Sequence, residues 1–356
     1  MDRAVGVVAL QLLAAGRRRK PLPYDPQRIG VIIPTAIGDT ILSSGVLSAL
    51  VDRYPRADLL VFHGESNASA VRLLPMRMTR IECPFTNPAA AIDLLRRKRL
   101  DMVVDLTPWT RITAIYACLA APVSVGFDPP GQHRGAAFDI AVRHRADAHE
   151  IDNHADLAAL FSGQPYRMNV VTEKFDALEG MKLERLVLCH SCAGGSRAAD
   201  KAWPVESWAE LARRLVSEGW QVGFTGTPAD ASLVQTILAK ATLPSTQVFS
   251  LCGKASLAQL GDLIQRARLL ITIDTGVLHL GAAVDAKILA LHGPTRSSRW
   301  GARTANATSL NSAHPAAGYM LYGYEAHPQG RETMLAHTVD NVANAAFVKL
   351  AQSTSS

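Results

Sequence analysis

The sequence predicts an α/β protein with two domains, each built on a parallel β-sheet. The chain has 356 residues, a length that favours two domains of about 150–180 residues over one core. Short apolar runs alternate with helix-like stretches of roughly ten to fifteen residues, which is typical of βαβ units. The alternation begins near residue 28 and begins again near residue 183. The 48% hydrophobic and 19% charged content is that of a globular protein with sizeable cores.

In the first series the clearest strand is the uninterrupted apolar run IGVII at 29–33. Such a run indicates a strand covered by helices on both faces, as in a parallel sheet. Further apolar runs predict strands at 57–62, 101–106 and 122–126, and helices are expected from the Gly38 turn to Tyr54 and over 66–74, 87–98 and 109–120. A polar stretch around 162–182 separates this series from the next.

The second series restarts with the apolar run LERLVLCH at 183–190. It continues with predicted strands at 220–226, 269–273 and 287–293 and predicted helices at 204–218, 228–241, 256–267 and 276–284. The chain is therefore divided into a leader (1–27), an N-terminal domain (28–165), a C-terminal domain (166–340) and a last helix end with its tail (341–356). Ligands of parallel sheets bind beyond the carboxyl ends of the strands, so the site is expected in a cleft between the domains.

The leader has an unusual charge pattern. Residues 4–15 carry no charge, and the basic cluster Arg17, Arg18, Arg19 and Lys20 follows directly. A signal peptide has its charges before the apolar run, so this order disfavours one. Two interpretations stay open. In one, a short helix lies on the inner leaflet with its basic cluster on anionic headgroups; in the other, the helix packs on the protein body. No stretch reaches the roughly 18–20 apolar residues that cross a bilayer.

Charge and cysteine content restrict the class of protein. The net charge is +6, aromatic residues make up 6%, and no basic stripe is interleaved with them, which argues against a nucleic-acid partner. Five cysteines, mostly in apolar runs, suggest reduced thiols in a reducing compartment such as the cytoplasm. Cys189 and Cys192 form a CxxC, but without a second pair or a nearby His pattern a structural role is favoured over a metal or redox role.

The first candidate site is the turn Gly38-Asp39-Thr40, which follows the strand at 29–33. Gly38 permits a tight turn between strand and helix. Asp39 stands at or next to the start of the helix, where Asp is a favoured N-cap. From this turn alone, Asp39 is either a helix cap or a catalytic carboxylate.

The second candidate site is Asp274-Thr275-Gly276, which ends the apolar strand at 269–273 and starts a helix. The backbone N–H groups of Thr275 and Gly276, at the positive end of that helix, would receive a phosphate or diphosphate. Asp274 could be a plain cap. His279 lies one turn into the helix, where it is either structural or a donor to the diphosphate.

The third candidate site is the loop SCAGGSRAADKAWP at 191–204. A Gly-rich loop that carries Ser196, Arg197 and Lys201 suits a diphosphate, although it is neither a Walker A sequence nor a GxGxxG. A fourth polar turn holds Asp230, whose carboxylate could meet a ribose hydroxyl or cap the next helix.

Together these elements resemble the lipopolysaccharide heptosyltransferases, glycosyltransferase family nine. The resemblance runs from about residue 28 to about residue 303 and is carried by IGVIIPTAIGDTILSSGVLSALVDRYPRADL, DKAWPVESWAELARRL, TGTPAD, SLCGKASLAQLGDLIQRARLLITIDTGVLHLGAA and LHGPT, in that order. It implies a GT-B fold, in which two Rossmann-like domains face each other across a cleft. It also implies an inverting mechanism, ADP-heptose as the usual donor and no metal.

The resemblance also implies roles for individual residues. Asp39 would be the catalytic base, with Gly38 and Thr40 in its turn on the acceptor side. Lys201 would contact the donor phosphate, and Asp230 would reach the nucleotide ribose. The remaining donor-side positions would be Thr275 and Gly276 on the diphosphate, Asp274 and His279 in the same cleft wall, and Ser196 and Arg197 in the phosphate loop.

Two positions depart from the family pattern. Arg197 stands where relatives carry a hydroxyl that faces phosphate, and Pro34-Thr35 stands where relatives usually have a basic residue. The sequence therefore does not predict the contacts made at these two places.

The predicted function is transfer of a sugar, with heptose from ADP-heptose favoured, to a hydroxyl of a saccharide or lipid-linked saccharide such as the lipopolysaccharide core. One alternative is a transferase that uses another nucleotide sugar or acceptor. Another is a sugar-nucleotide epimerase or a dehydrogenase, and the missing GxGxxG after the first strand disfavours the dehydrogenase. A non-catalytic nucleotide-sugar-binding relative is the third.

Overall fold

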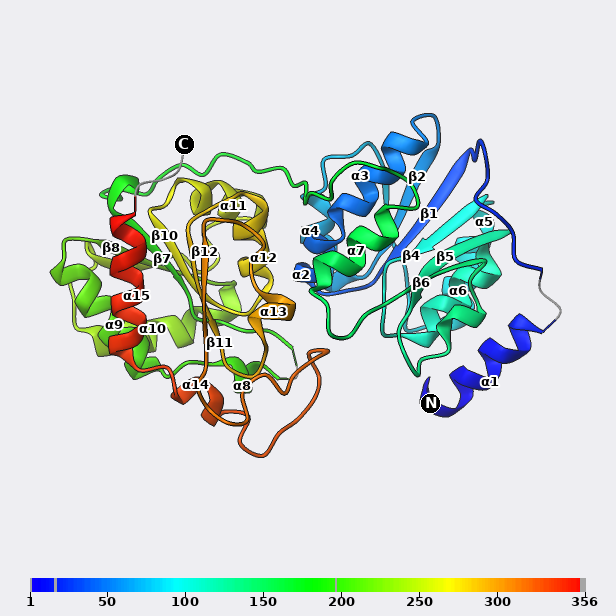
Figure 1. Ribbon diagram of the computed structural model, residues 1–356. Coiled ribbons are helices and arrows are strands. Elements are labelled where there is room, and N and C mark those ends of the chain that lie inside the picture. The colour runs from blue at the N-terminus through cyan, green and yellow to red at the C-terminus, as the bar shows by residue number, and fades with distance from the viewer. Residues whose placement is uncertain (1, 16–17, 196, 353–356) are drawn as a thin grey trace. The chain divides into compact units, whose positions relative to one another are not determined.

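The computed structural model describes residues 2–15, 18–195 and 197–352. The chain divides into two compact units, Met1–Val170 and Val171–Ser356, whereas the sequence analysis placed the boundary between 165 and 166. Each unit holds one six-stranded sheet in which all pairings are parallel. The α/β class with two parallel-sheet units is confirmed (Figure 1).

The first unit has the strand order β3-β2-β1-β4-β5-β6. Its strands are β1 (Arg28–Ile33), β2 (Asp58–His63), β3 (Thr79–Glu82), β4 (Met102–Asp105), β5 (Val123–Asp128) and β6 (Ile140–Arg143). Its α-helices are α1 (Asp2–Ala14), α2 (Ile37–Leu42), α3 (Ser44–Arg53), α4 (Ala68–Arg72), α5 (Pro88–Arg97), α6 (Arg111–Ala120) and α7 (Glu150–Ala158), with 3-10 turns η1 (Glu65–Asn67) and η2 (Arg134–Ala136).

The four central strands of this unit, β1, β2, β4 and β5, are buried on both faces, and their successive side chains point to opposite sides of the sheet. Val31 and Ile33 of β1 belong to a core with residues of α3 and α7, while Ile32 lies in a second core with residues of α5 and α6. This two-sided cover explains why β1 reads as an unbroken apolar run.

The second unit has the strand order β12-β11-β10-β7-β8-β9. Its strands are β7 (Leu186–His190), β8 (Gln221–Thr225), β9 (Val248–Ser250), β10 (Leu269–Ile273), β11 (Ile288–His292) and β12 (Ala307–Asn311). Its α-helices are α8 (Ala198–Lys201), α9 (Val205–Ser217), α10 (Ala231–Ala241), α11 (Leu257–Arg266), α12 (Gly276–Ala283), α13 (Ser297–Trp300), α14 (Glu332–Leu335) and α15 (Val339–Ala351), with 3-10 turns η3 (Leu183–Arg185) and η4 (Pro228–Asp230).

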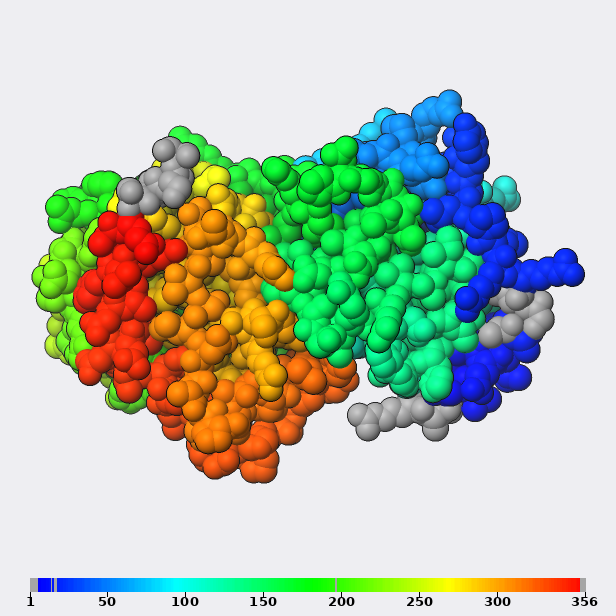
Figure 2. Space-filling model, in the orientation of Figure 1, coloured from blue at the N-terminus to red at the C-terminus, as the bar shows by residue number. Residues whose placement is uncertain are grey.

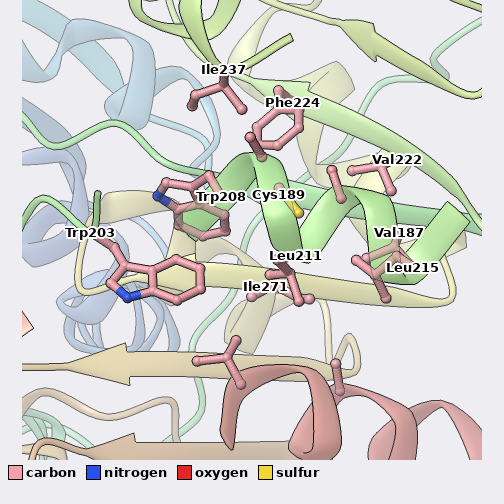
Figure 3. Packing of buried hydrophobic residues seen from close by; sticks show 14 of the residues in the cluster. Val187, Cys189, Trp203, Trp208, Leu211, Leu215, Val222, Phe224, Ile237 and Ile271 are labelled. Atoms are coloured by element: carbon pink, nitrogen blue, oxygen red, sulfur yellow. The ribbon is translucent and has the colours of Figure 1, made fainter. Parts of the chain in front are cut away.

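One core of the second unit joins β7, β8 and β10 to α9, α10 and α15, and Figure 3 shows Leu211 and Leu215 of α9 beside Val187 and Ile271 of the sheet. On the opposite face α12 packs closely, since a Cβ on Gly281 would meet the side chains of Leu270 and Ile288. Helix α15, red in Figure 2, lies at the surface of its unit.

Helix α1 packs on α6 and η2 of the first unit. Leu10 is fully buried there, while Val8 and Leu12 are 56% and 71% exposed. The segment that follows is also attached to the unit, since Arg19 donates to the Gly135 carbonyl and the Lys20 N–H donates to Asp139. Arg17 lies outside the described residues. The leader thus contacts the protein body, and an apolar part of it stays uncovered. No helix in the described ranges is long and apolar enough to span a bilayer.

The sequence analysis missed four strands, β3, β6, β9 and β12, and these are the two edge strands of each sheet. Edge strands are short and only partly covered, so they need no continuous apolar run. All four residues of β3 are exposed or half-buried, and so are all five of β12. The missed helix α7 contributes Leu157 and Ala158 to the core beside α3.

Candidate active site

The two sheets share one topology, and most of the predicted site residues follow a central strand of their sheet. Renumbered from its first strand, the second sheet has the order 3-2-1-4-5-6, as the first sheet does. In this arrangement the chain leaves strands 1 and 4 in opposite directions, and ligands bind at the carboxyl ends of this pair. The pair is β1 and β4 in the first unit and β7 and β10 in the second. Asp39 follows β1, Lys201 follows β7 and Asp274 follows β10.

Asp39 lies inside α2 and is not its N-cap. The N-cap position is Ala36, which makes no side-chain capping hydrogen bond, and Asp39 is in the first helical turn. The simple capping interpretation of Asp39 is therefore wrong. Asp39 is half-buried, and its neighbours Gly38 and Thr40 are buried. A carboxylate in the first turn interacts favourably with the positive end of the helix. Its role as a base stays a prediction.

A buried asparagine that the sequence analysis missed holds this turn in place. Asn67 is fully buried, and its Nδ2 donates to the Ile33 carbonyl at 2.7 Å and to Thr40 Oγ1 at 2.9 Å. Its Oδ1 accepts the Gly64 N–H at 3.0 Å. Thr40 Oγ1 in turn donates to the Ala36 carbonyl at 2.9 Å. Asn67 thus links three segments by hydrogen bonds: the end of β1, the loop after β2, and the helix that carries Asp39.

Replacement of Asn67 by Ala is expected to lower the free energy of unfolding by about 1–3 kcal/mol, because it leaves buried donors and acceptors without partners. It is also expected to reduce kcat more than KM, since the Asp39 turn loses its fixed position. Denaturant unfolding and steady-state kinetics measure the two effects. The matched control is Asn306→Ala at a half-buried position in the second unit. An unchanged kcat in a folded Asn67→Ala protein would contradict the positioning role.

A second group missed by the sequence analysis lies at the carboxyl end of β4. Asp105 and Arg134 are fully buried and form an ion pair of 2.6 Å. Asp105 also accepts the Thr107 N–H at 2.9 Å, and Arg134 donates to the Thr107 carbonyl. Burial raises the pKa of Asp105 above its ordinary value, although Arg134 and the hydrogen bonds from Thr107 and Thr113 act in the opposite direction. The pair fixes the loop after β4 beside the end of β5.

In the second unit, Lys201 and Asp274 are in contact although 73 positions separate them in sequence. Lys201 Nζ lies 3.4 Å from Asp274 Oδ2 and donates to the Asp274 backbone carbonyl at 3.2 Å. The side chains are 20% and 8% exposed. The structure thus brings together the loop after β7 and the turn after β10, as expected of two parts of one binding site.

Asp274 has a lowered pKa and is not a helix cap. Burial alone would raise the pKa of Asp274, but Lys201, His292, His279 and a hydrogen bond from Thr295 outweigh burial and lower it. The N-cap of α12 is Thr275, so the capping interpretation of Asp274 is wrong. His279 is buried in α12 and lies near Asp274.

Thr275 presents an unused polar atom at the start of α12. It makes no side-chain capping hydrogen bond, and its buried Oγ1 has no hydrogen-bond partner within the described part of the chain. A buried hydroxyl without a partner is uncommon and costs about 1–3 kcal/mol. Together with the N–H groups at the start of α12, this hydroxyl forms a set of donors suited to a phosphate oxygen.

The position of Lys201 is fixed by the residues that follow it. Trp203 is buried, and its indole N–H donates to the His337 carbonyl at 2.9 Å. Its ring meets that of Trp208 edge-on, with centroids 5.0 Å apart, as Figure 3 shows. Pro204 is the N-cap of α9. The Lys-x-Trp-Pro order therefore places a lysine on a loop that a buried tryptophan anchors.

Two other predicted donor residues, Arg197 and Asp230, make contacts within the protein. Arg197 lies 3.7 Å from Asp200, and Ser196 lies outside the described residues. Asp230 Oδ2 accepts the N–H and the hydroxyl of Thr227 at 2.7 and 2.6 Å. Asp230 thus completes the capping box of the 3-10 turn η4, while it makes no side-chain capping hydrogen bond to the following helix α10.

The surroundings of the two CxxC cysteines agree with the structural role that the sequence analysis favoured. Cys189 and Cys192 are both free and buried. Burial raises the pKa of both thiols, that of Cys192 to about 12, so they stay protonated at neutral pH and are poor nucleophiles and metal ligands. Among the residues that the structure describes, no group of three or more His, Cys, Asp or Glu side chains could hold a metal ion.

Comparison with known proteins places these features in a family. The family model for glycosyltransferase family 9 (heptosyltransferase) matches residues 89–319. Lipopolysaccharide heptosyltransferase 2 of Escherichia coli (strain K12) is 26% identical over 294 residues, which cover 75% of this chain and 83% of that protein. Lipopolysaccharide heptosyltransferase 2 of Salmonella typhimurium is 24% identical over 296 residues, with the same coverage.

Solved structures show the same fold. E. coli ADP-heptose LPS heptosyltransferase II has a TM-score of 0.69 at 23% identity and covers 91% of this chain and 98% of its own. A glycosyl transferase of family 9 from Veillonella parvula has a TM-score of 0.73 at 20% identity and covers 94% of this chain and 100% of its own. The predicted GT-B fold is confirmed by these likenesses.

Proposed function

The chain belongs to glycosyltransferase family 9, the heptosyltransferases, and on this premise we propose that it transfers heptose from ADP-heptose to a hydroxyl of a lipopolysaccharide core saccharide. Several relatives are lipopolysaccharide heptosyltransferases, and one solved relative is described as an ADP-heptose enzyme. The single observation in this chain that carries the proposal is the contact of Lys201 with Asp274 beside the Thr275 hydroxyl.

These groups suit the leaving group of the reaction. Departure of a nucleoside diphosphate develops negative charge on a phosphate oxygen. Lys201 supplies a positive charge that is 20% exposed, and the N–H groups at the start of α12 supply fixed dipoles. Asp274 orients Lys201 through its carboxylate and its backbone carbonyl. This donor set stabilises the leaving diphosphate without a metal, so a metal-independent reaction is part of the proposal.

Asp39 supplies the base in the proposed mechanism. Its carboxylate accepts the proton of the acceptor hydroxyl while that oxygen forms a bond to the anomeric carbon. The bond from the anomeric carbon to the diphosphate breaks on the opposite face, and the electron pair leaves with the phosphate oxygen. The sugar is therefore transferred with inversion. This sequence requires Asp39 to face Lys201 and Thr275, which stays a prediction.

The leader supports a location near the inner membrane surface. Val8 and Leu12 are exposed on α1, and the basic residues Arg18, Arg19 and Lys20 follow. Exposed apolar side chains next to cations are typical of a helix that meets anionic lipid. We propose peripheral contact of this helix with the cytoplasmic leaflet, where a lipid-linked acceptor would be presented.

The function is tested by thermal shift with ADP, GDP, UDP and their sugars, followed by a transfer assay with ADP-heptose and a heptose-free lipopolysaccharide acceptor. We expect ADP and ADP-heptose to raise Tm most, since ligands that bind only the folded state stabilise it, and we expect mass spectrometry to show one added heptose. Stabilisation by another nucleotide alone would favour a different donor. Binding without transfer to any acceptor would favour a non-catalytic relative.

A further inference from the structure

An aromatic loop follows β12 in the second unit, and the mechanism proposed above does not use it. It spans residues 318–325, with the sequence GYMLYGYE. The Tyr319 hydroxyl donates to Asp200 Oδ2 at 2.8 Å, and Asp200 is the residue before Lys201 in α8. The aromatic loop is therefore attached to the part of the unit that carries the proposed donor site.

Tyr322 and Tyr324 form the outer end of a series of stacked groups. Arg299 Cζ lies over the Trp300 ring, 5.2 Å from its centroid, and over the Tyr322 ring, 5.6 Å from its centroid. The rings of Tyr322 and Tyr324 are stacked, with centroids 6.0 Å apart and an interplanar angle of 27°. Arg299 is 3% exposed, whereas Tyr324 is 50% exposed. The series therefore leads from a buried guanidinium to an aromatic ring that is open to solvent.

Hydrogen bonds hold the two tyrosines in position. The Glu325 carboxylate accepts the backbone N–H of Tyr322 at 3.0 Å and that of Tyr324 at 3.2 Å. Gly323 lies between them with φ of +91°, a conformation that glycine adopts without strain. The Leu321 carbonyl accepts hydrogen bonds from the arginine and tryptophan side chains of α13 at 2.8 and 3.2 Å. Because the loop is fixed in this way, a ligand that stacks on the outer ring would immobilise little further.

The outer ring suits the face of a sugar. The face of an aromatic ring carries partial negative charge, and the C–H groups on one face of a sugar ring carry partial positive charge. The phenolic hydroxyls of Tyr322 and Tyr324 can donate and accept hydrogen bonds with sugar hydroxyl groups. The Glu325 carboxylate beside the rings would repel a phosphate. The chemistry therefore favours a neutral sugar ring over a charged part of the donor.

The place of the loop favours a sugar of the acceptor. The loop contacts α13, which follows β11, whereas Asp230, the predicted ribose contact, follows β8. Two strands lie between β8 and β11, which sets their ends about 14 Å apart at about 4.8 Å for each spacing. The nucleoside is thus expected away from the loop. A core saccharide holds several linked rings and reacts through one of them, so its other rings need contacts on exposed surface such as Tyr324.

We infer that Tyr324, supported by Tyr322, is a stacking platform for a sugar ring of the acceptor. The inference rests on the proposed function and extends it from the donor to the acceptor. The aromatic face, rather than the hydroxyl, supplies most of the binding, so phenylalanine should replace Tyr324 with little loss. A donor sugar has the same chemistry as an acceptor sugar, and the experiment separates the two sources.

The test compares full-length Tyr324→Ala and Tyr324→Phe with the wild type, using ADP-heptose and heptose-free lipopolysaccharide. We expect Tyr324→Ala to raise KM for the lipopolysaccharide about five- to tenfold, the effect of a lost stacking contact. Calorimetry without acceptor should give an ADP-heptose affinity within about twofold of the wild-type value. Tyr324→Phe should keep the acceptor KM within about twofold, because it keeps the aromatic face. The matched control is Tyr24→Ala, which removes a tyrosine of the first unit that is 89% exposed.

Each other outcome overturns a defined part of the inference. An unchanged acceptor KM in Tyr324→Ala would exclude the platform while the proposed function stands. A matching loss of ADP-heptose affinity would assign the ring to the donor and overturn the acceptor assignment. An equal rise of KM in Tyr324→Phe and Tyr324→Ala would attribute the effect to the hydroxyl and overturn the stacking. A wild type that transfers heptose to no acceptor would overturn the proposed function and the inference together.

Discussion

Replacement of Asp39 by Asn is expected to lower turnover by about two to four orders of magnitude, the range of a missing general base. Asn retains the size of the side chain but cannot accept the proton of the acceptor hydroxyl. Affinity for ADP should stay close to that of the wild type, because the proposed donor contacts lie on other loops. Single-turnover transfer and calorimetry with ADP measure the two effects.

The control for Asp39→Asn is Asp52→Asn, an exposed carboxylate on α3 of the same unit. Both variants should have a free energy of unfolding within about 1 kcal/mol of the wild-type value. A carboxylate in the first turn of a helix contributes at most about this amount to stability. The kcat–pH profile distinguishes a base from a structural carboxylate, since loss of the base removes the acidic limb. Near-normal turnover in Asp39→Asn would eliminate Asp39 as the base.

Replacement of Lys201 by Ala is expected to lower kcat/KM by about two to three orders of magnitude, the effect of a lost charge-stabilising donor. Most of this loss should appear as weaker donor binding, because the lysine contacts the phosphate in both the ground state and the transition state. Lys201→Arg should recover part of the activity, since it keeps the positive charge. Calorimetry with ADP and steady-state kinetics provide the readout.

The same substitution, Lys201→Ala, is also expected to lower the stability of the folded state. The pH dependence of this effect follows from the lowered pKa of Asp274. Lys201 helps to keep the pKa of Asp274 below its ordinary value, so this interaction stabilises the folded state above the unfolded pKa and is lost as the pH falls through the folded pKa. The free energy of unfolding of Lys201→Ala should therefore be about 1–3 kcal/mol below that of the wild type at neutral pH. The difference should be smaller at acidic pH. Lys240→Ala, which removes an exposed ion pair with Glu206, is the control. Unchanged ADP affinity in Lys201→Ala would contradict its phosphate role.

The central strands and the ligand-binding turns could be predicted because their signals are local. A buried parallel strand needs an unbroken apolar run, and a turn into a helix needs small and polar residues next to it. The run at 29–33 satisfies the first condition, and the Asp-Thr-Gly turn satisfies the second. The edge strands were missed for the opposite reason. A strand such as β3 gains its place by backbone pairing with β2, and pairing imposes no apolar pattern on exposed side chains.

The residues that position the site could not be predicted from the sequence for a related reason. Asn67 stands in the predicted helix at 66–74 as an ordinary polar residue, and only its contacts with Ile33 and Thr40 make it part of the Asp39 turn. Arg134 reads as a surface cation, yet it is fully buried against Asp105. Each residue stands among other polar and small residues in the sequence, a pattern that many exposed segments share.

The sequence by itself determined the α/β class, the two parallel-sheet units and the turn that carries Asp39, because residues adjacent in the chain build each of these features. The tertiary structure decided which turns become neighbours. Strand order places β7 beside β10 and thereby brings Lys201 to Asp274. It also decided that Asp39 lies within the first turn of its helix and does not cap it. Hydrophobic periodicity fixes which face of an element is buried, but the order of strands depends on packing between distant segments, which no local pattern records.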